Sequence, residues 1–176
     1  MDFKILTEKE KRLYKDDIIC TLKESDNDFV PPLSMRNSTT QTDLTCSTAL
    51  GDQAIFSYGN EMLSQVILGA FEENNLLGFV SFKENYTNDI ITSDSLPNIY
   101  ISTLVLKKEA RGKRLTQQMY DCLFNNLYKD RSIFTRTWST NAAHLKILEN
   151  FNFTLIKTIE NDRGVGIDTV YFALQR

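Results

Sequence analysis

The sequence predicts a single mixed α/β (α+β) domain over residues 1–176, and two observations carry this prediction. Strand-like and helix-like segments follow one another in the order β-α-loop-α-β-β-β-α-β-α-β-β. A β-branched, apolar segment at about 99–107 leads through the basic turn Arg111-Gly112-Lys113-Arg114 into an apolar ladder at four-residue steps. A strand, a short turn and a helix in succession indicate one or more right-handed crossovers.

Each predicted element has a local signal in the sequence. Thr7 and Glu10 form a capping box at the start of the first helix. The turn at 73–75 separates two apolar runs and predicts a hairpin, and Asn141 has the chemistry of a helix cap. The predicted strands lie at 3–6, 65–72, 76–83, 99–107, 132–137, 153–160 and 169–174, and the predicted helices lie at 7–23, 52–63, 114–128 and 141–150.

The segment between the first two helices, residues 29–51, is polar and irregular. A connection of this length inside a compact domain is usually functional or disordered. Its apolar side chains, Phe29, Val30, Leu33 and Met35, give it anchors and favour a functional lid. A mobile connector is the alternative.

Composition fits an ordinary globular domain, with 41% hydrophobic residues, 24% charged residues and a net charge of -3. This mildly acidic balance argues against nucleic-acid binding, because such domains are usually basic. No run approaches the ~20 apolar residues of a membrane span, and no metal-ligand spacing occurs. Cys20, Cys46 and Cys122 are interpreted as mostly buried thiols of a reducing compartment. We therefore expect a cytoplasmic protein without nucleic-acid, membrane or metal partners.

The basic turn at the strand–helix junction predicts an anion site. Free backbone N–H groups and the positive end of the helix dipole point at the same place when a strand feeds a turn into a helix. The four-residue ladder that follows, Leu115, Met119, Leu123 and Leu127, predicts the buried face of that helix. A solvated charged turn is the alternative for the three cations.

The turn and its surroundings resemble the GNAT superfamily of N-acetyltransferases. The stretch 111–116 is similar to the acyl-CoA pyrophosphate loop of that family, Gln/Arg-x-x-Gly-x-Gly/Ala. Residues 104–106 match the strand segment that pairs with pantetheine. Asn141, an apolar helix and Asn152-Phe153 resemble the second cofactor segment, which is usually Asn, a helix and Gly-Phe. The resemblance implies a mixed, mostly antiparallel sheet of about six or seven strands flanked by about four helices.

The chain departs from the family pattern at three positions. Arg114 and Asn152 stand where the family has Gly, and Thr116 stands where it has Gly or Ala. A non-Gly residue at 114 limits how closely the backbone approaches a phosphate, and the Arg114 guanidinium offsets this by offering its own hydrogen bonds. The resemblance implies acetyl-CoA as cofactor, bound by Leu104, Val105, Leu106, Arg111, Gly112, Lys113, Arg114, Leu115, Thr116, Gln117 and Asn141.

The implied reaction is direct attack of a primary amine, from a small molecule or a peptide, on the acetyl thioester in a ternary complex. The family draws its oxyanion donor from backbone N–H groups near 104–106. Its usual acid is a tyrosine on the helix after the Asn, and Leu148 occupies that position here. The candidates by chemistry are Tyr100, Ser102, His144 and Tyr171. Water, no acid at all, and a merely packed His144 are the alternatives.

The acceptor side is the least patterned part of the sequence. In the loop 161–168, Asp168 is a candidate to hold a cationic acceptor and Arg163 a carboxylate or phosphate, and Trp138 is a candidate pocket wall. An internal Arg–Asp pair and a core tryptophan are the alternatives.

Two other functions are left open by the sequence. One is a non-catalytic acyl-CoA-binding or sensor domain, and the other is a plain protein-interaction domain. We expect a monomer or homodimer.

Overall fold

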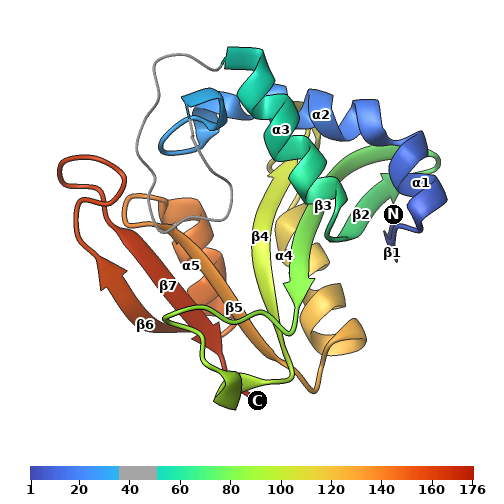
Figure 1. Ribbon diagram of the computed structural model, residues 1–176. Coiled ribbons are helices and arrows are strands. Elements are labelled where there is room, and N and C mark those ends of the chain that lie inside the picture. The colour runs from blue at the N-terminus through green and yellow to red at the C-terminus, as the bar shows by residue number, and fades with distance from the viewer. Residues whose placement is uncertain (36–50) are drawn as a thin grey trace.

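The computed structural model describes residues 1–35 and 51–176, so residues 36–50 of the predicted lid lie outside the described part. Within it, seven strands form one sheet in the order β1-β2-β3-β4-β5-β7-β6 (Figure 1). The strands are β1 (Asp2–Ile5), β2 (Val66–Glu72), β3 (Asn75–Glu84), β4 (Asn98–Leu106), β5 (Ser132–Trp138), β6 (Thr154–Ile159) and β7 (Thr169–Leu174). The α-helices are α1 (Glu8–Leu13), α2 (Lys15–Glu24), α3 (Gly51–Leu63), α4 (Leu115–Asp121) and α5 (Ala142–Asn150).

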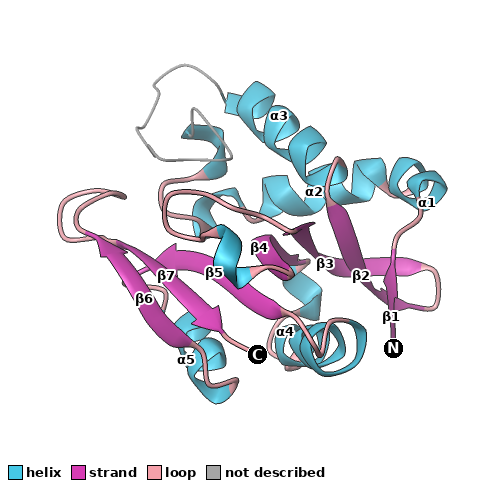
Figure 2. Ribbon diagram, turned by 60° about the horizontal axis from the view of Figure 1, so that its bottom comes forward, coloured by secondary structure: helices cyan, strands magenta, loops and turns pink. Residues whose placement is uncertain are grey.

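The sheet is mixed and mostly antiparallel, which confirms the predicted fold class. Only β4 and β5 pair in parallel, and α4 connects them as a crossover. Helices α1 to α3 lie on one face of the sheet, and α4 and α5 lie on the other (Figure 2). None of the helices in the described ranges has both the length and the hydrophobicity that a bilayer crossing requires.

Two cores result from the alternation of side chains along each strand. In β2, Ile67 is buried among residues of α2 and α3, whereas its neighbour Leu68 is buried among residues of α4 and α5. Both side chains are fully buried. Helix α3 contributes Ile55, Tyr58 and Met62 to the first core at helical spacing.

The structure corrects three details of the predicted helices. The first helix is interrupted at Tyr14, whose ring packs on Phe71 with 5.1 Å between centroids, and Leu13 is 70% exposed beside the break. The thiol of Cys20 is exposed rather than buried. The helix after the basic turn becomes π-helical over Cys122–Leu127, and the wider turn moves Leu127 out of the apolar ladder to 47% exposure.

A bulge in β4 positions the site. Strand β3 pairs Ser81 with Thr103 and Phe82 with Ile101, so Ser102 is an extra residue that has no partner in the register. The side chains beyond it change face: Leu106 packs, like Ile101, in the core beside α4, while Val105 packs in the core beside α3. The bulge therefore reverses which alternate residues of β4 face α4: odd-numbered residues do so before it and even-numbered residues after it.

Candidate active site

The candidate site is a pocket of about 540 Å³ where β4 and β5 separate. Their pairing runs from Asn98–Ser132 to Ile101–Thr135 and stops there, and the two strands then run apart (Figure 1). Among the described residues, the stretch of β4 beyond the bulge consequently has no strand partner on its β5 side. The pocket is lined by residues 25, 28, 29, 101–106, 111, 112, 114–117, 120, 135–138, 141, 143, 144 and 147.

The basic turn forms one end of this pocket. Gly112 (φ 75°) and Arg114 (φ 58°) both have left-handed backbone, and Arg114 is the N-cap of α4. No atom outside the turn lies within 4 Å of the position a Gly112 Cβ would take, so this backbone faces open space. Lys113, which was predicted to bind the cofactor, does not line the pocket. Leu115, Thr116 and Gln117 do.

The guanidinium of Arg111 faces the opposite side of the pocket. It lies 2.8 Å from a carboxylate oxygen of Asp28 and donates to the Ser25 hydroxyl at 3.1 Å. It also donates to the carbonyl oxygen of Leu106 at 3.3 Å. Arg111 therefore ties the short helix η1 (Asp26–Asp28) to the end of β4. The backbone carbonyl of Arg114 accepts from the N–H of Gln118 at 3.2 Å, but its guanidinium has no hydrogen-bond or ion-pair partner among the described residues.

Residues 104–106, which are predicted to bind the cofactor, line the pocket, and the bulge adds a second feature. The hydroxyl oxygen of Ser102 is buried and has no hydrogen-bond partner among the described residues. An extended chain of amides, such as pantetheine, fits an unpaired strand edge because it can complete the ladder. These residues therefore fit the arm of coenzyme A, and the open turn at Gly112 fits its pyrophosphate.

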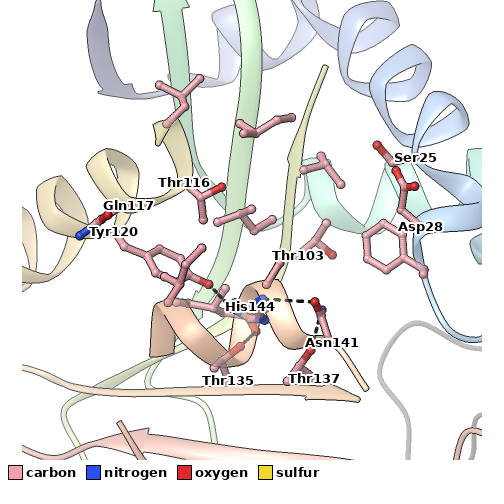
Figure 3. Close-up of a pocket in the computed structure, with 18 of the residues that line it drawn as sticks. Ser25, Asp28, Thr103, Thr116, Gln117, Tyr120, Thr135, Thr137, Asn141 and His144 are labelled. Carbon is pink, nitrogen blue, oxygen red and sulfur yellow. Dashed lines mark hydrogen bonds between the residues drawn. The ribbon is translucent and has the colours of Figure 1, made fainter. Parts of the chain in front are cut away.

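Asn141 lies where α5 meets β5. Its side-chain oxygen accepts from the backbone N–H of His144 at 3.2 Å, so Asn141 caps α5 as predicted. Its amide nitrogen donates to the Thr137 hydroxyl at 3.0 Å. This fixes the orientation of Asn141 on the pocket wall (Figure 3).

His144 has a partner that sequence reasoning missed. The hydroxyl of Tyr120, on α4, lies 2.8 Å from Nε2 of His144, and both residues line the pocket (Figure 3). Phe124 and Phe151 surround the Tyr120 ring at centroid distances of 4.7 Å and 6.0 Å. Burial raises the pKa of Tyr120 and lowers the pKa of His144 to about 4, so both are neutral at pH 7.

The other predicted acids are differently placed. Ser102 lines the pocket, but Tyr100 and Tyr171 do not. Both tyrosines are buried in a separate apolar cluster with Ile91 and Phe134. The Tyr171 hydroxyl accepts from Arg136 at 3.2 Å. Leu148 is fully buried in the core beside α4, outside the pocket lining.

Two of the three predicted acceptor residues organise a loop instead. Arg163 is 9% exposed and donates from Nε to Thr169 at 2.9 Å and from Nη1 to the carbonyl oxygen of Val30 at 2.6 Å. The carboxylate of Asp168 accepts from the backbone N–H of Asn161 at 2.9 Å. Neither Arg163 nor Asp168 lines the pocket, whereas Trp138 does.

Solved structures share this fold over nearly their whole length. An N-acetyltransferase from Staphylococcus aureus Mu50 is 18% identical with a TM-score of 0.61, covering 99% of this chain and 97% of that one. The Salmonella typhimurium protein yncA, solved with its cofactor acetyl-CoA, is 12% identical with a TM-score of 0.61 and coverages of 99% and 93%. Ribosomal-protein-alanine N-acetyltransferase from Brucella melitensis is 13% identical with a TM-score of 0.62 and complete coverage of both chains.

No curated protein matches the chain. The acetyltransferase (GNAT) family, however, matches residues 34–153. This range contains the basic turn, residues 104–106 of β4 and Asn141, which are the segments that carried the resemblance. Because the match spans most of the chain, the protein belongs to the acetyltransferase (GNAT) family, and acetyl-CoA is its cofactor.

Proposed function

We propose that this protein transfers the acetyl group of acetyl-CoA to a primary amine of a small molecule or peptide, by direct attack in a ternary complex. The observation that carries the proposal is the opening between β4 and β5, where the β5 side of β4 has no strand partner beyond Ile101 among the described residues. When bound, acetyl-CoA supplies an activated acetyl thioester. The pocket at this opening is lined both by residues of the basic turn and by Asp28 of η1.

Three parts of the lining support the cofactor-binding half of the proposal. The turn at 112–117 offers backbone N–H groups and the Arg114 guanidinium to phosphates. The unpaired edge at 104–106 offers backbone groups to the amides of the pantetheine arm. Asn141, held by Thr137, offers its amide from the other wall.

To stabilise the departing thiolate of coenzyme A we propose a hydrogen bond from the Tyr120 hydroxyl, which His144 orients, in place of the acid missing at Leu148. Because the pKa of Tyr120 is raised, its hydroxyl keeps its proton and can donate a hydrogen bond into the pocket. Because the pKa of His144 is about 4, its imidazole is not a cationic acid at pH 7 and acts by orienting the tyrosine hydroxyl. The variant Tyr120→Phe should lower kcat while the KM for acetyl-CoA changes little.

The function is tested by measuring cofactor binding and acetyl transfer separately. Coenzyme A at 100 times its Kd should stabilise the protein by about 2.7 kcal/mol, which corresponds to roughly 5–10 °C in Tm for a domain of this size. Release of free thiol from acetyl-CoA should depend on an added amine, and mass spectrometry should find the amine heavier by one acetyl group. An unchanged Tm with coenzyme A would refute the proposal.

A non-catalytic acyl-CoA sensor is the second candidate, favoured by one observation. The position of the usual acid is Leu148, which is fully buried outside the pocket lining. A sensor predicts the same rise in Tm with coenzyme A and no amine-dependent thiol release from any amine. The two measurements therefore separate the candidates.

A further inference from the structure

The pocket has an aromatic wall beside η1. Phe29, just after η1, and Trp138, at the end of β5, both line the pocket, and their ring centroids are 6.1 Å apart. Both side chains are half-buried. Trp138 projects from the same strand as Thr137, which holds Asn141 on the cofactor side. The wall therefore begins next to the region that the proposed function assigns to the cofactor.

Trp138 is supported from behind. The guanidinium of Arg163 lies 5.5 Å from the centre of the Trp138 ring, and Arg163 does not line the pocket. Its hydrogen bonds to Val30 and Thr169 hold it between the segment that carries Phe29 and the loop before β7. A ring stacked on a fixed cation keeps its orientation, so the face of Trp138 toward the pocket is a prearranged apolar surface.

The charges of the lining disfavour a polycationic acceptor. Among the described lining residues Asp28 is the one carboxylate, and it is 2.8 Å from Arg111. Three arginines, Arg111, Arg114 and Arg136, line the same pocket. The described lining therefore offers no unpaired carboxylate to an ammonium group, so each further ammonium group of a polyamine would lose its hydration there without gaining an ion-pair partner.

We infer that the acceptor is a monoamine carrying an aromatic ring, bound with that ring against Phe29 and Trp138. This inference rests on the proposed function and names the class of its second substrate. An aromatic ring on such a wall gains apolar burial and ring–ring contact. Arylalkylamines and peptides with an aromatic first residue share this chemistry, and both are used as probes below.

The single tryptophan of the chain makes the inference testable without turnover. Trp138 fluorescence should change on titration with phenethylamine or with the peptide Phe-Gly-Gly, and the probe with the lower Kd identifies the source. Spermidine and ethylamine should need at least tenfold higher concentrations for the same change. Equal or tighter binding of spermidine, or no response to either aromatic probe, would overturn the inference.

A matched pair of variants locates the binding. Phe29→Ala should raise the Kd for the aromatic probe about tenfold, whereas Phe56→Ala removes an exposed ring of α3 outside the pocket and should leave it unchanged. Phe29→Leu keeps apolar bulk and should give an intermediate Kd, and the Tm rise with coenzyme A shows that each variant is folded. An unchanged Kd in Phe29→Ala would overturn the inference. If the aromatic probe binds but is not acetylated, the proposed function is contradicted and the inference is not. If spermidine is the one amine that is acetylated, the inference is contradicted and the proposed function is not.

Discussion

Arg114 combines a strained backbone with the one cation of the basic turn that lines the pocket without an ion-pair partner in the described structure. Two substitutions distinguish the effect of the backbone strain from the effect of the charge. Arg114→Ala removes the guanidinium and keeps the left-handed strain, because Ala also has a Cβ. Arg114→Gly removes both. We predict that the Gly variant is more stable than the wild type while both variants bind coenzyme A less tightly.

The magnitudes follow from the backbone and the exposure. A left-handed conformation costs an L-residue roughly 1–2 kcal/mol, and Gly returns roughly 0.5–1 kcal/mol of that through its larger unfolded-state entropy. Arg114→Gly should therefore gain up to about 1 kcal/mol, which is roughly 2–4 °C in Tm. The guanidinium is exposed and screened, so its loss should cost about 1–2 kcal/mol of binding, or roughly 5–30-fold in Kd.

Stability is measured by urea denaturation of the protein without cofactor, and the Kd of coenzyme A by titration calorimetry at two salt concentrations. Both variants should lose part of the salt dependence of binding. Asn152→Gly is the matched control: Asn152 has φ 60° but lies outside the pocket, and Asn tolerates this conformation better than Arg. Its stability gain should be smaller and its Kd unchanged. Equal destabilisation by Gly and Ala would refute the strain argument, and an unchanged Kd in both would remove Arg114 from the phosphate site.

Three further predictions concern other parts of the site. Because burial lowers the pKa of His144 from 6.5 to about 4, the unfolded chain is protonated first as pH falls, and stability should drop by on the order of 3 kcal/mol between pH 7 and 4. The chain has one histidine, so His144→Asn should show a shallower drop in urea titrations, and parallel curves would contradict this. Gly78→Ala would put a Cβ 2.5 Å from the carbonyl oxygen of Val105 in β4, so it should cost roughly 1–3 kcal/mol and weaken coenzyme A binding; a wild-type Tm would argue against it. Arg163→Ala should shift the fluorescence emission of Trp138 to the red, because it exposes the ring to water. An unchanged spectrum would contradict the inference that Arg163 covers one face of Trp138.

The fold was predictable from local signals. The capping box at Thr7, the hairpin at 73–75 and the strand–turn–helix at 99–128 all lie where the structure has them, because each depends on residues close together in the sequence. The break at Tyr14 and the π-helical turn were not predictable, because both depend on tertiary packing that overrides the apolar spacing.

Local sequence signals placed the turn and the helix cap that border the pocket, but not the contacts between segments that lie far apart in the sequence. Gly112 and Asn141 belong to short motifs in which neighbouring residues determine the backbone conformation, a left-handed turn at Gly112 and a helix cap at Asn141. Tyr120 was missed because it falls between ladder positions of α4 and meets His144 only when α4 and α5 pack together. The contact of Arg163 with Val30 was not predictable, because Val30 lies 133 residues away and no local pattern indicates it.

The bulge at Ser102 explains how one strand can serve two substrates. In a regular strand, alternate side chains keep to their own face from end to end, so Ile101, Thr103 and Val105 would all lie beside α4. With one extra residue, Thr103 turns to meet the hydroxyl of Tyr58 on α3, and Leu104 packs beside α4. Under the proposed function, β4 beyond this point has its cofactor side toward α4 and its acceptor side toward η1. Because a regular register would place the wrong side chains on each side, deleting Ser102 should abolish acetyl transfer even if the sheet still forms.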